Sequence, residues 1–149
     1  MDFLVRINNI DQLISAFRRA PSIVAPIVQR ALLASQAVLA KYTTRDTVPF
    51  ITGFLLQSFS AFMEPGILHW YPTASYARFV EFGTAPHVIE PKNAKALYWP
   101  GAQHPVKRVN HPGSKANPYM ERIIAAAAPD INATFGTALQ QIAKALATQ

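Results

Sequence analysis

The order of apolar and polar positions predicts a chain of helices, then strands, then helices. Apolar residues recur three and four positions apart over 10–17 and again over 27–44. The second stretch predicts a helix of about 20 residues, roughly 30 Å long. We expect Ala20-Pro21 to end the first helix, because proline disfavours helical geometry in the residue before it. Ser22 is then expected to cap the second helix, with Pro26 in its first turn.

The middle of the chain predicts short strands. Residues 58–63 and 67–72 are rich in aromatic and other strand-forming residues, and they flank Glu64-Pro65-Gly66-Ile67, which is typical of a tight turn. These segments therefore predict a β-hairpin. We expect further strands within 87–99 and a short strand over Phe3–Ile7.

Local signals also predict where helices and loops begin and end in the second half of the chain. Thr73 is expected to cap a short helix over 74–82, and Gly83 to end that helix in a left-handed conformation. Prolines and glycines are frequent in 100–117, which predicts an extended loop. A brief strand over Val106–Val109 is expected inside this loop.

The last third of the chain predicts helices that complete a single domain. Asn117-Pro118 is typical of a helix start, and Pro129 is expected to kink or split the helix that follows. The predicted fold class is α+β, with a small antiparallel β-sheet packed against a long N-terminal helix of about 23–44 and against C-terminal helices. One domain spans 1–149. Its expected core is Leu13, Phe17, Val28, Leu32, Leu39, Phe59, Ile67, Trp70, Phe79, Val80, Leu97, Ile123, Phe135 and Leu139.

Composition excludes several classes of protein. Half of the 149 residues are hydrophobic and 15% are charged, which is typical of a chain that folds around a core. The sequence has no cysteine, which excludes disulfide scaffolds, thiolate zinc sites and thiol nucleophiles. The uninterrupted apolar runs are shorter than a transmembrane helix requires, so we expect no contact with a membrane.

Positive charge is concentrated in one part of the chain. The formal net charge is +6, and most of the excess falls within 91–122. A basic segment favours contact with nucleic acid or with an acidic protein surface, whereas the simplest alternative is a solvated loop. The basic residues of this segment, which are opposed by Glu121 alone, are Lys92, Lys95, Lys107, Arg108, Lys115 and Arg122.

Residue types that carry catalysis do not form a recognisable motif. The sequence lacks GxSxG, the P-loop, GxGxxG and HExxH. His87, His104 and His111 could bind zinc only if the loop brought them together, and Glu81 and Glu90 could act as paired carboxylates only across a cleft. We therefore expect no enzymatic activity, no cofactor and no metal. A small hydrolase or a metal-binding protein that uses these residues remains a third interpretation.

Two stretches carry most of the information about function. They are SYARFVEFGT, which begins at Ser75 and is followed by APHVIEP and ALYWPG, and HPGSKANPYM, which begins at His111. Together with Thr52-Gly53-x-Leu-x-x-Ser, they resemble the neck and tail-completion proteins of long-tailed double-stranded DNA bacteriophages over roughly residues 1–130. The family has a Tyr-Ala-x-x-Val/Leu-Glu-x-Gly-Thr core and a small-x-Pro-aromatic/Met helix start. These are matched by Tyr76, Ala77, Val80, Glu81, Phe82, Gly83, Thr84 and by Ala116, Asn117, Pro118, Tyr119, Met120.

The resemblance implies a structural virion protein rather than an enzyme. Such a protein joins the tail to the head-side connector and lies in the virion at the head–tail junction, after synthesis in the host cytoplasm. It implies a closed homo-oligomeric ring, with six copies favoured over twelve, that contacts other neck and tail proteins such as the head-closure protein and the tail terminator. No sequence-specific nucleic acid is expected as a partner. The insert at 85–112 departs from the family pattern.

The residues expected to make assembly contacts follow from the matched motifs and the basic loop. Glu81 is expected either to pair with Arg78 or to reach a basic residue of a neighbouring subunit. The charge-poor final helix and the 100–117 loop are the expected ring contacts. The alternative function is a basic, single-domain nucleic-acid-binding protein. The candidate assembly residues are Tyr76, Arg78, Glu81, Phe82, Gly83, Thr84, Lys107, Arg108, Lys115, Pro118 and Tyr119.

Overall fold

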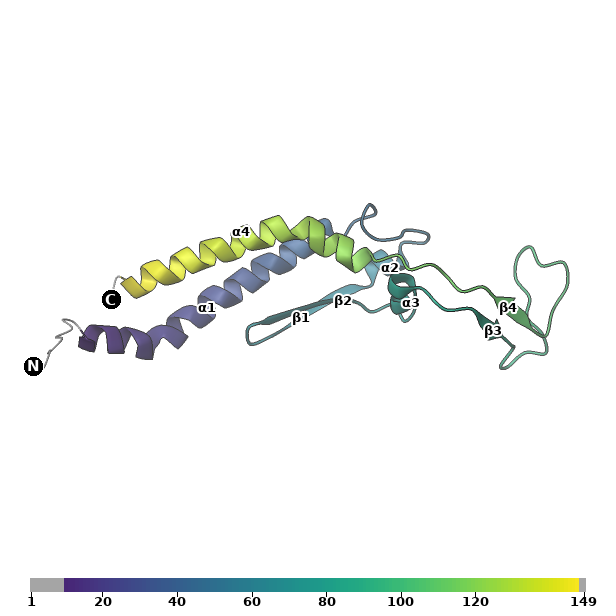
Figure 1. Cartoon of the computed structure of the whole chain (residues 1–149), viewed down its shortest axis with the longest axis horizontal. Helices are drawn as coiled ribbons and strands as arrows, with labels where there is room; N and C mark the ends of the chain where they lie inside the picture. Colours follow the sequence, from purple (N-terminus) through teal and green to yellow (C-terminus); the bar gives the residue numbers. More distant parts are fainter. Residues whose placement is uncertain (1–9, 148–149) are drawn as a thin grey trace, which may run out of the picture.

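The molecule is elongated, with two long helices at one end and a thin β-ribbon at the other. The computed structural model describes the backbone of residues 10–147 and the side chains of residues 20–147. Helices α1 (Ile10–Tyr42) and α4 (Tyr119–Ala147) lie side by side. A β-hairpin lies along α1, and the second pair of strands projects away from the helices (Figure 1). The predicted strand at 3–7 lies outside the described residues.

Helix α1 is a single helix, so the expected break at Pro21 is wrong. Both Pro21 and Pro26 lie inside α1. An internal proline removes one backbone hydrogen bond and costs about 3 kcal/mol. Apolar packing on α4 opposes that cost, because Ile27 and Ala31 are buried against Ala138. Figure 1 shows that α1 changes direction in its N-terminal third, as expected for a proline-containing helix.

Helix α4 likewise continues through Pro129, so the proline does not split it. Buried residues lie on both sides of the proline, with Ile123 and Ala127 before it and Ala138 after it. These contacts hold both halves of α4 against the rest of the protein. Figure 1 shows α4 as one curved helix.

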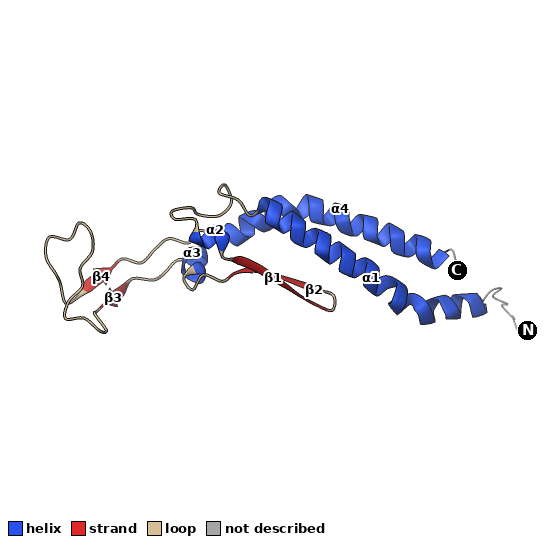
Figure 2. Cartoon of the chain, turned by 180° about the vertical axis from the view of Figure 1, so that it is seen from behind, coloured by secondary structure: helices blue, strands red, loops and turns tan. Residues whose placement is uncertain are grey.

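The predicted hairpin is confirmed. Strand β1 (Phe59–Glu64) pairs in antiparallel register with β2 (Ile67–Pro72), from Phe59↔Pro72 to Glu64↔Ile67. One helical turn that the sequence analysis did not predict, α2 (Phe54–Gln57), precedes β1. The α+β fold class is confirmed, with the hairpin beside the long N-terminal helix (Figure 2).

The expected third strand of this sheet is wrong. Strand β3 (His87–Ile89) pairs with β4 (Val109–His111) in a separate two-stranded sheet. Within 96–108 the only ladder contact is an isolated bridge between Leu97 and Val106. Of the strands expected over 96–99 and 106–109, only Val109 lies in a strand, as the first residue of β4. Thr84 pairs with Ser114 rather than with the hairpin, which directs this part of the chain away from the helices.

The core forms where α1, α4, the hairpin and the short helix α3 (Ala77–Phe82) meet. Of the predicted core residues, Leu32, Leu39 and Ile123 are buried. Val48, Leu55 and Tyr119 are also buried, although the sequence analysis did not place them in the core. Half-buried predictions are Val28, Phe59, Trp70, Val80, Leu97 and Phe135.

Three predicted core residues are exposed, which corrects the sequence analysis. Ile67 lies at the tip of the hairpin, Phe79 lies on α3, and Leu139 lies on α4. Periodicity alone marked them as apolar positions but did not show that the elements over 10–147 leave them uncovered. The side chains of Leu13 and Phe17 lie outside the described part of the chain.

The segment Ala20–Tyr42 of α1 is long and apolar enough, by length and composition, to cross a membrane. This corrects the estimate from uninterrupted apolar runs, because scattered polar residues do not prevent a high average hydropathy. One face of the segment packs inside the protein through Ile27, Ala31 and Leu39. That packing is typical of a core helix.

Candidate functional site

The candidate site begins at Thr73, directly after strand β2 of the hairpin. Both the backbone N–H and the hydroxyl of Thr73 donate to the carbonyl of Ser58, each over 2.8 Å. The expected role of Thr73 as a helix cap is therefore wrong, because its hydroxyl closes the hairpin instead. Helix α3 begins three residues later than expected, at Ala77, with Tyr76 as its N-terminal flanking residue.

The structure brings the two informative stretches of sequence together. Thr84 and Ser114 exchange two backbone hydrogen bonds, over 3.0 and 3.1 Å. The N–H of Asn117 donates to the carbonyl of Val80 over 2.9 Å. We call the region formed by residues 76–84 and 113–120 the α3–α4 joint, because it links the short helix to the start of α4.

Two glycines allow the backbones of the joint to come this close. A Cβ on Gly83 would lie 2.4 Å from the carbonyl oxygen of Ser114, and a Cβ on Gly113 would lie 2.2 Å from the carbonyl oxygen of Thr84. Gly83 has a φ of 71°, as the expected helix end requires, but its ψ of −174° places it outside the left-handed helical region. Gly83 therefore begins an extended segment rather than a Schellman-type cap.

Glu81 has a backbone partner within its own chain. Its Oε2 accepts a hydrogen bond from the N–H of Met120 over 3.0 Å. Met120 lies in the first turn of α4, where N–H groups lack helical partners and where the helix dipole favours a negative charge. The carboxylate thus caps α4 from α3, a role that the sequence analysis missed.

The expected pairing of Glu81 with Arg78 is wrong. Among the described residues, the recorded ion pairs are Lys41–Asp130 and the longer His69–Glu64 contact. The guanidinium of Arg78 lies over the ring of Phe79, 5.3 Å from its centroid. A contact from Glu81 to a neighbouring subunit stays a prediction.

Tyr119 is the buried anchor of the joint. Its side chain is almost fully buried, its hydroxyl donates to the carbonyl of Ala77 over 3.2 Å, and its ring meets Phe59 edge to face. Burial raises the pKa of the Tyr119 phenol, and the nearby groups of Glu81 and Tyr76 raise it further. Tyr119 was expected at an assembly contact, but within the subunit it is a core residue.

An exposed aromatic patch lies beside the joint. Ile51 is 94% exposed and Phe82 is 79% exposed, which is unusual for residues of this size. The ring of Phe54 lies 6.2 Å from that of Tyr76, so the patch continues from the 50–54 loop to α3. A groove of about 370 Å³ runs between the loop and the joint. The patch consists of Phe50, Ile51, Phe54, Tyr76, Phe79 and Phe82.

Sequence reasoning assigned only Tyr76 and Phe82 of this patch to assembly contacts and placed Phe79 in the core. Residues 45–53 were predicted to be a connection, and Phe54 was not treated as a surface residue. The available signal was the presence of Phe50, Ile51 and Phe54 around Gly53. Large apolar residues in a loop, where the chain offers little cover, are typical of an interaction surface.

The basic residues do not form one continuous surface. Lys107 and Arg108 lie between the Leu97–Val106 bridge and β4, whereas Lys115 and Pro118 lie at the joint. Arg122 is structural, because its guanidinium donates to the carbonyl of Thr47 over 3.1 Å and to the Asn117 Oδ1 over 2.6 Å. The positive charge of 91–122 is therefore divided among three places.

The described part of the chain contains no group of three or more His, Cys, Asp or Glu side chains able to hold a metal ion. His87 and His111 face each other across β3 and β4, with ring centroids 5.0 Å apart. The Nδ1 of His87 contacts the carbonyl of Ala85, and the Nδ1 of His111 accepts from the N–H of Gly113. Both contacts stabilise the base of the β3–β4 ribbon.

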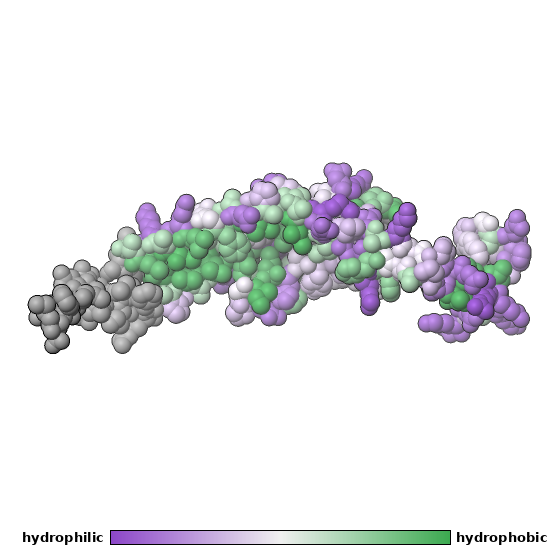
Figure 3. Space-filling view, in the orientation of Figure 1, coloured by the Kyte–Doolittle hydropathy of each residue, from purple (hydrophilic) through white to green (hydrophobic). Residues whose placement is uncertain are grey.

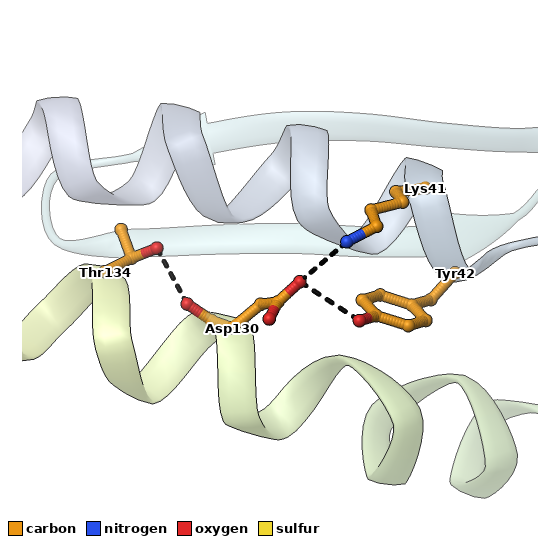
Figure 4. Close-up of polar contacts among 4 residues, drawn as sticks. All are labelled: Lys41, Tyr42, Asp130 and Thr134. Atoms are coloured by element: carbon orange, nitrogen blue, oxygen red, sulfur yellow. Dashed lines mark hydrogen bonds and ion pairs between the residues drawn. The ribbon is translucent and has the colours of Figure 1, made fainter.

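A polar cluster clamps the two long helices behind the joint (Figure 4). The Oδ2 of Asp130 accepts from the Nζ of Lys41 over 2.9 Å and from the hydroxyl of Tyr42 over 3.0 Å. The hydroxyl of Thr134 donates to the backbone carbonyl of Asp130. The hydrogen bond from Lys41 lowers the pKa of Asp130, and the reciprocal bond raises the pKa of Lys41.

No protein-family model, curated protein or solved structure matches this chain. The α3–α4 joint and the aromatic patch are therefore the features of the described residues that bear on function.

Proposed function

We propose that the protein is a structural component of the phage neck, where it completes the tail and joins it to the head-side connector. The observation that carries the proposal is the α3–α4 joint. The two stretches that resemble the neck and tail-completion family lie far apart in the sequence, yet they bind each other through Thr84 and Ser114. Because both stretches that carry the resemblance lie in one structural unit, together they support it better than either stretch alone.

The exposed surface beside the joint supports a role in assembly. The aromatic patch leaves Ile51 and Phe82 in solvent, and exposed apolar surface of this kind is typical of a protein–protein contact. A closed ring requires two different faces on each subunit, because every subunit contacts its neighbours in a head-to-tail manner. We propose the aromatic patch as one of these faces, in addition to the final helix and the 100–117 loop.

The decisive experiment removes the protein from a phage that carries its gene. An amber mutation in the gene is expected to give filled heads and separate tails under the electron microscope, and a plasmid copy is expected to restore joined virions. Joined, infectious virions in the absence of the protein would overturn the proposal.

Variants of the patch test the assembly face with the fold intact. Ile51→Ser combined with Phe82→Ser removes exposed apolar surface, so circular dichroism is expected to match the wild type while complementation fails. The matched control is Leu33→Ser, which changes a half-exposed apolar residue on α1. If the patch variant and the control complement equally well, the patch is not an assembly face.

A further inference from the structure

The β3–β4 ribbon is an arm that extends beyond the protein core. The pairs Thr84↔Ser114 and His87↔His111 belong to one continuous register, and the Leu97↔Val106 bridge extends the ribbon further. Figures 1 and 2 show this region projecting away from the long helices and the hairpin. We call residues 84–114 the arm. A two-stranded ribbon without a covering layer has little stability of its own, which is typical of a segment that contacts a partner.

The arm carries the charge that the joint does not use. Its four cations are Lys92, Lys95, Lys107 and Arg108, and Glu90 is its one carboxylate. All four cations are exposed, and none belongs to an ion pair recorded among the described residues. Figure 3 shows hydrophilic residues gathered at this end of the molecule.

Two of these cations line the same hollow on the arm. Lys92 and Arg108 come from opposite sides of the arm and line a hollow of about 570 Å³, to which Glu90 contributes one carboxylate. The arm also carries Tyr98, which is 68% exposed, and Trp99, which is 45% exposed, and Lys95 lies three residues before Tyr98. Exposed flat rings and exposed cations on the same arm suit a polyanion that also has flat rings, because its bases stack on aromatic side chains while its phosphates contact the cations.

We propose that the arm binds nucleic acid through its phosphate backbone, without reading the base sequence. The four cations supply the phosphate contacts, and Tyr98 and Trp99 supply surfaces on which unpaired bases stack. An acidic protein surface would satisfy the cations but would leave the exposed aromatic rings unexplained. Lys107 and Arg108 also lie in the 100–117 loop that is proposed as a ring contact, but this inference does not depend on the proposed role in the neck, since its test measures DNA binding by the purified chain alone.

The test measures binding of the full chain to a labelled DNA duplex, and to a single strand of the same length, by fluorescence anisotropy over a range of salt concentrations. Each phosphate contact contributes about −0.9 to the slope of log K against log salt for a duplex. The double substitution Lys107→Gln/Arg108→Gln is therefore expected to reduce the slope by about 2. The matched control, Arg30→Gln/Arg45→Gln, removes the same charge outside the arm and is expected to leave the slope nearly unchanged.

The two forms of DNA distinguish stacking from simple charge attraction. Trp99→Ala is expected to weaken single-strand binding roughly tenfold and duplex binding much less, because only unpaired bases stack on the ring. Circular dichroism confirms that each variant is folded. Equal losses of slope in the arm variant and the control would overturn the proposal, since the attraction would then come from overall charge. Equally tight binding of an acidic polypeptide would also overturn it, in favour of an acidic protein partner.

Discussion

Glu81 gives the sharpest test of the joint, because the structure and the sequence assign it different partners. In the structure, its Oε2 accepts from the N–H of Met120 over 3.0 Å and so caps α4. Replacing a capping acceptor by alanine costs about 0.5–2 kcal/mol, and the interaction of a negative charge with a helix N-terminus contributes about 0.3–1 kcal/mol. Glu81→Gln keeps an acceptor and loses only the charge, so we expect it to cost less than Glu81→Ala.

The assay is urea unfolding followed by far-ultraviolet circular dichroism, with the free energy of unfolding taken from the midpoint and slope. Glu121 provides the matched control, because it lies in the same first turn of α4 and is exposed. We expect Glu121→Ala to lower stability by no more than about 0.3–1 kcal/mol, the share of the helix dipole.

Two outcomes would refute the reasoning. If Glu81→Ala destabilises the protein no more than Glu121→Ala, the cap contributes nothing in solution. If Glu81→Gln leaves the free energy of unfolding unchanged while phage assembly fails, the important contact of Glu81 is with a neighbouring subunit. That result would restore the prediction made from the sequence, in which a basic residue of the neighbour holds this carboxylate.

Three further predictions concern the joint and the polar contacts of Asp130. Gly83→Ala is expected to lower the free energy of unfolding by roughly 2–5 kcal/mol, because it adds a clash with the backbone to an unfavourable φ. Gly66→Ala is the control, with a positive φ but open space around it, and is expected to lower it by about 1 kcal/mol. Urea unfolding of both variants measures the difference. Because the pKa of Tyr119 is raised in the folded state, its phenol stays protonated above about pH 10, where the phenol of the unfolded chain ionises. The free energy of unfolding therefore falls as the pH rises above about 10. Tyr119→Phe is expected to make this alkaline loss shallower, and urea midpoints measured across the alkaline range check it. Because the pKa of Asp130 is lowered in the folded state, its ionised carboxylate stabilises the fold above about pH 4, and this contribution is lost as the pH falls. Asp130→Asn is therefore expected to make stability depend less on pH in the acid range of the same urea measurements.

The parts of the fold that could be predicted from the sequence depend on local chemistry. The turn at Pro65-Gly66 specifies the hairpin because proline presets φ and glycine accepts a positive φ, which is 78° in the structure. Asn117-Pro118 specifies the start of α4 because proline at a helix start loses no hydrogen bond. At Gly83 the expected left-handed conformation was correct only in φ, because its ψ of −174° lies outside the left-handed helical region.

The parts that could not be predicted depend on contacts between distant segments. Proline signals within 20–26 and at 129 favoured helix breaks, but packing between α1 and α4 keeps both helices continuous. The cap from Glu81 to Met120 joins residues 39 positions apart, and no local pattern indicates it. The strands within 87–99 were expected to join the hairpin sheet, but β3 pairs with β4 instead, because the sequence of a short strand does not specify its partner.

The location of the family-like residues explains why their resemblance points to a type of architecture more than to a partner. Gly83 is required by the approach of the 114–116 backbone, Tyr119 fills the core, and Glu81 caps α4, so each of these residues has a structural reason within one subunit. The surfaces left for other molecules are the aromatic patch and the arm, and most of their residues lie outside the matched positions. Substitutions in the joint are therefore expected to reduce stability first, whereas substitutions at exposed positions such as Ile51 and Lys107 are expected to change binding at unchanged stability. Measuring the two effects separately for each variant distinguishes residues that hold the fold together from residues that bind other molecules.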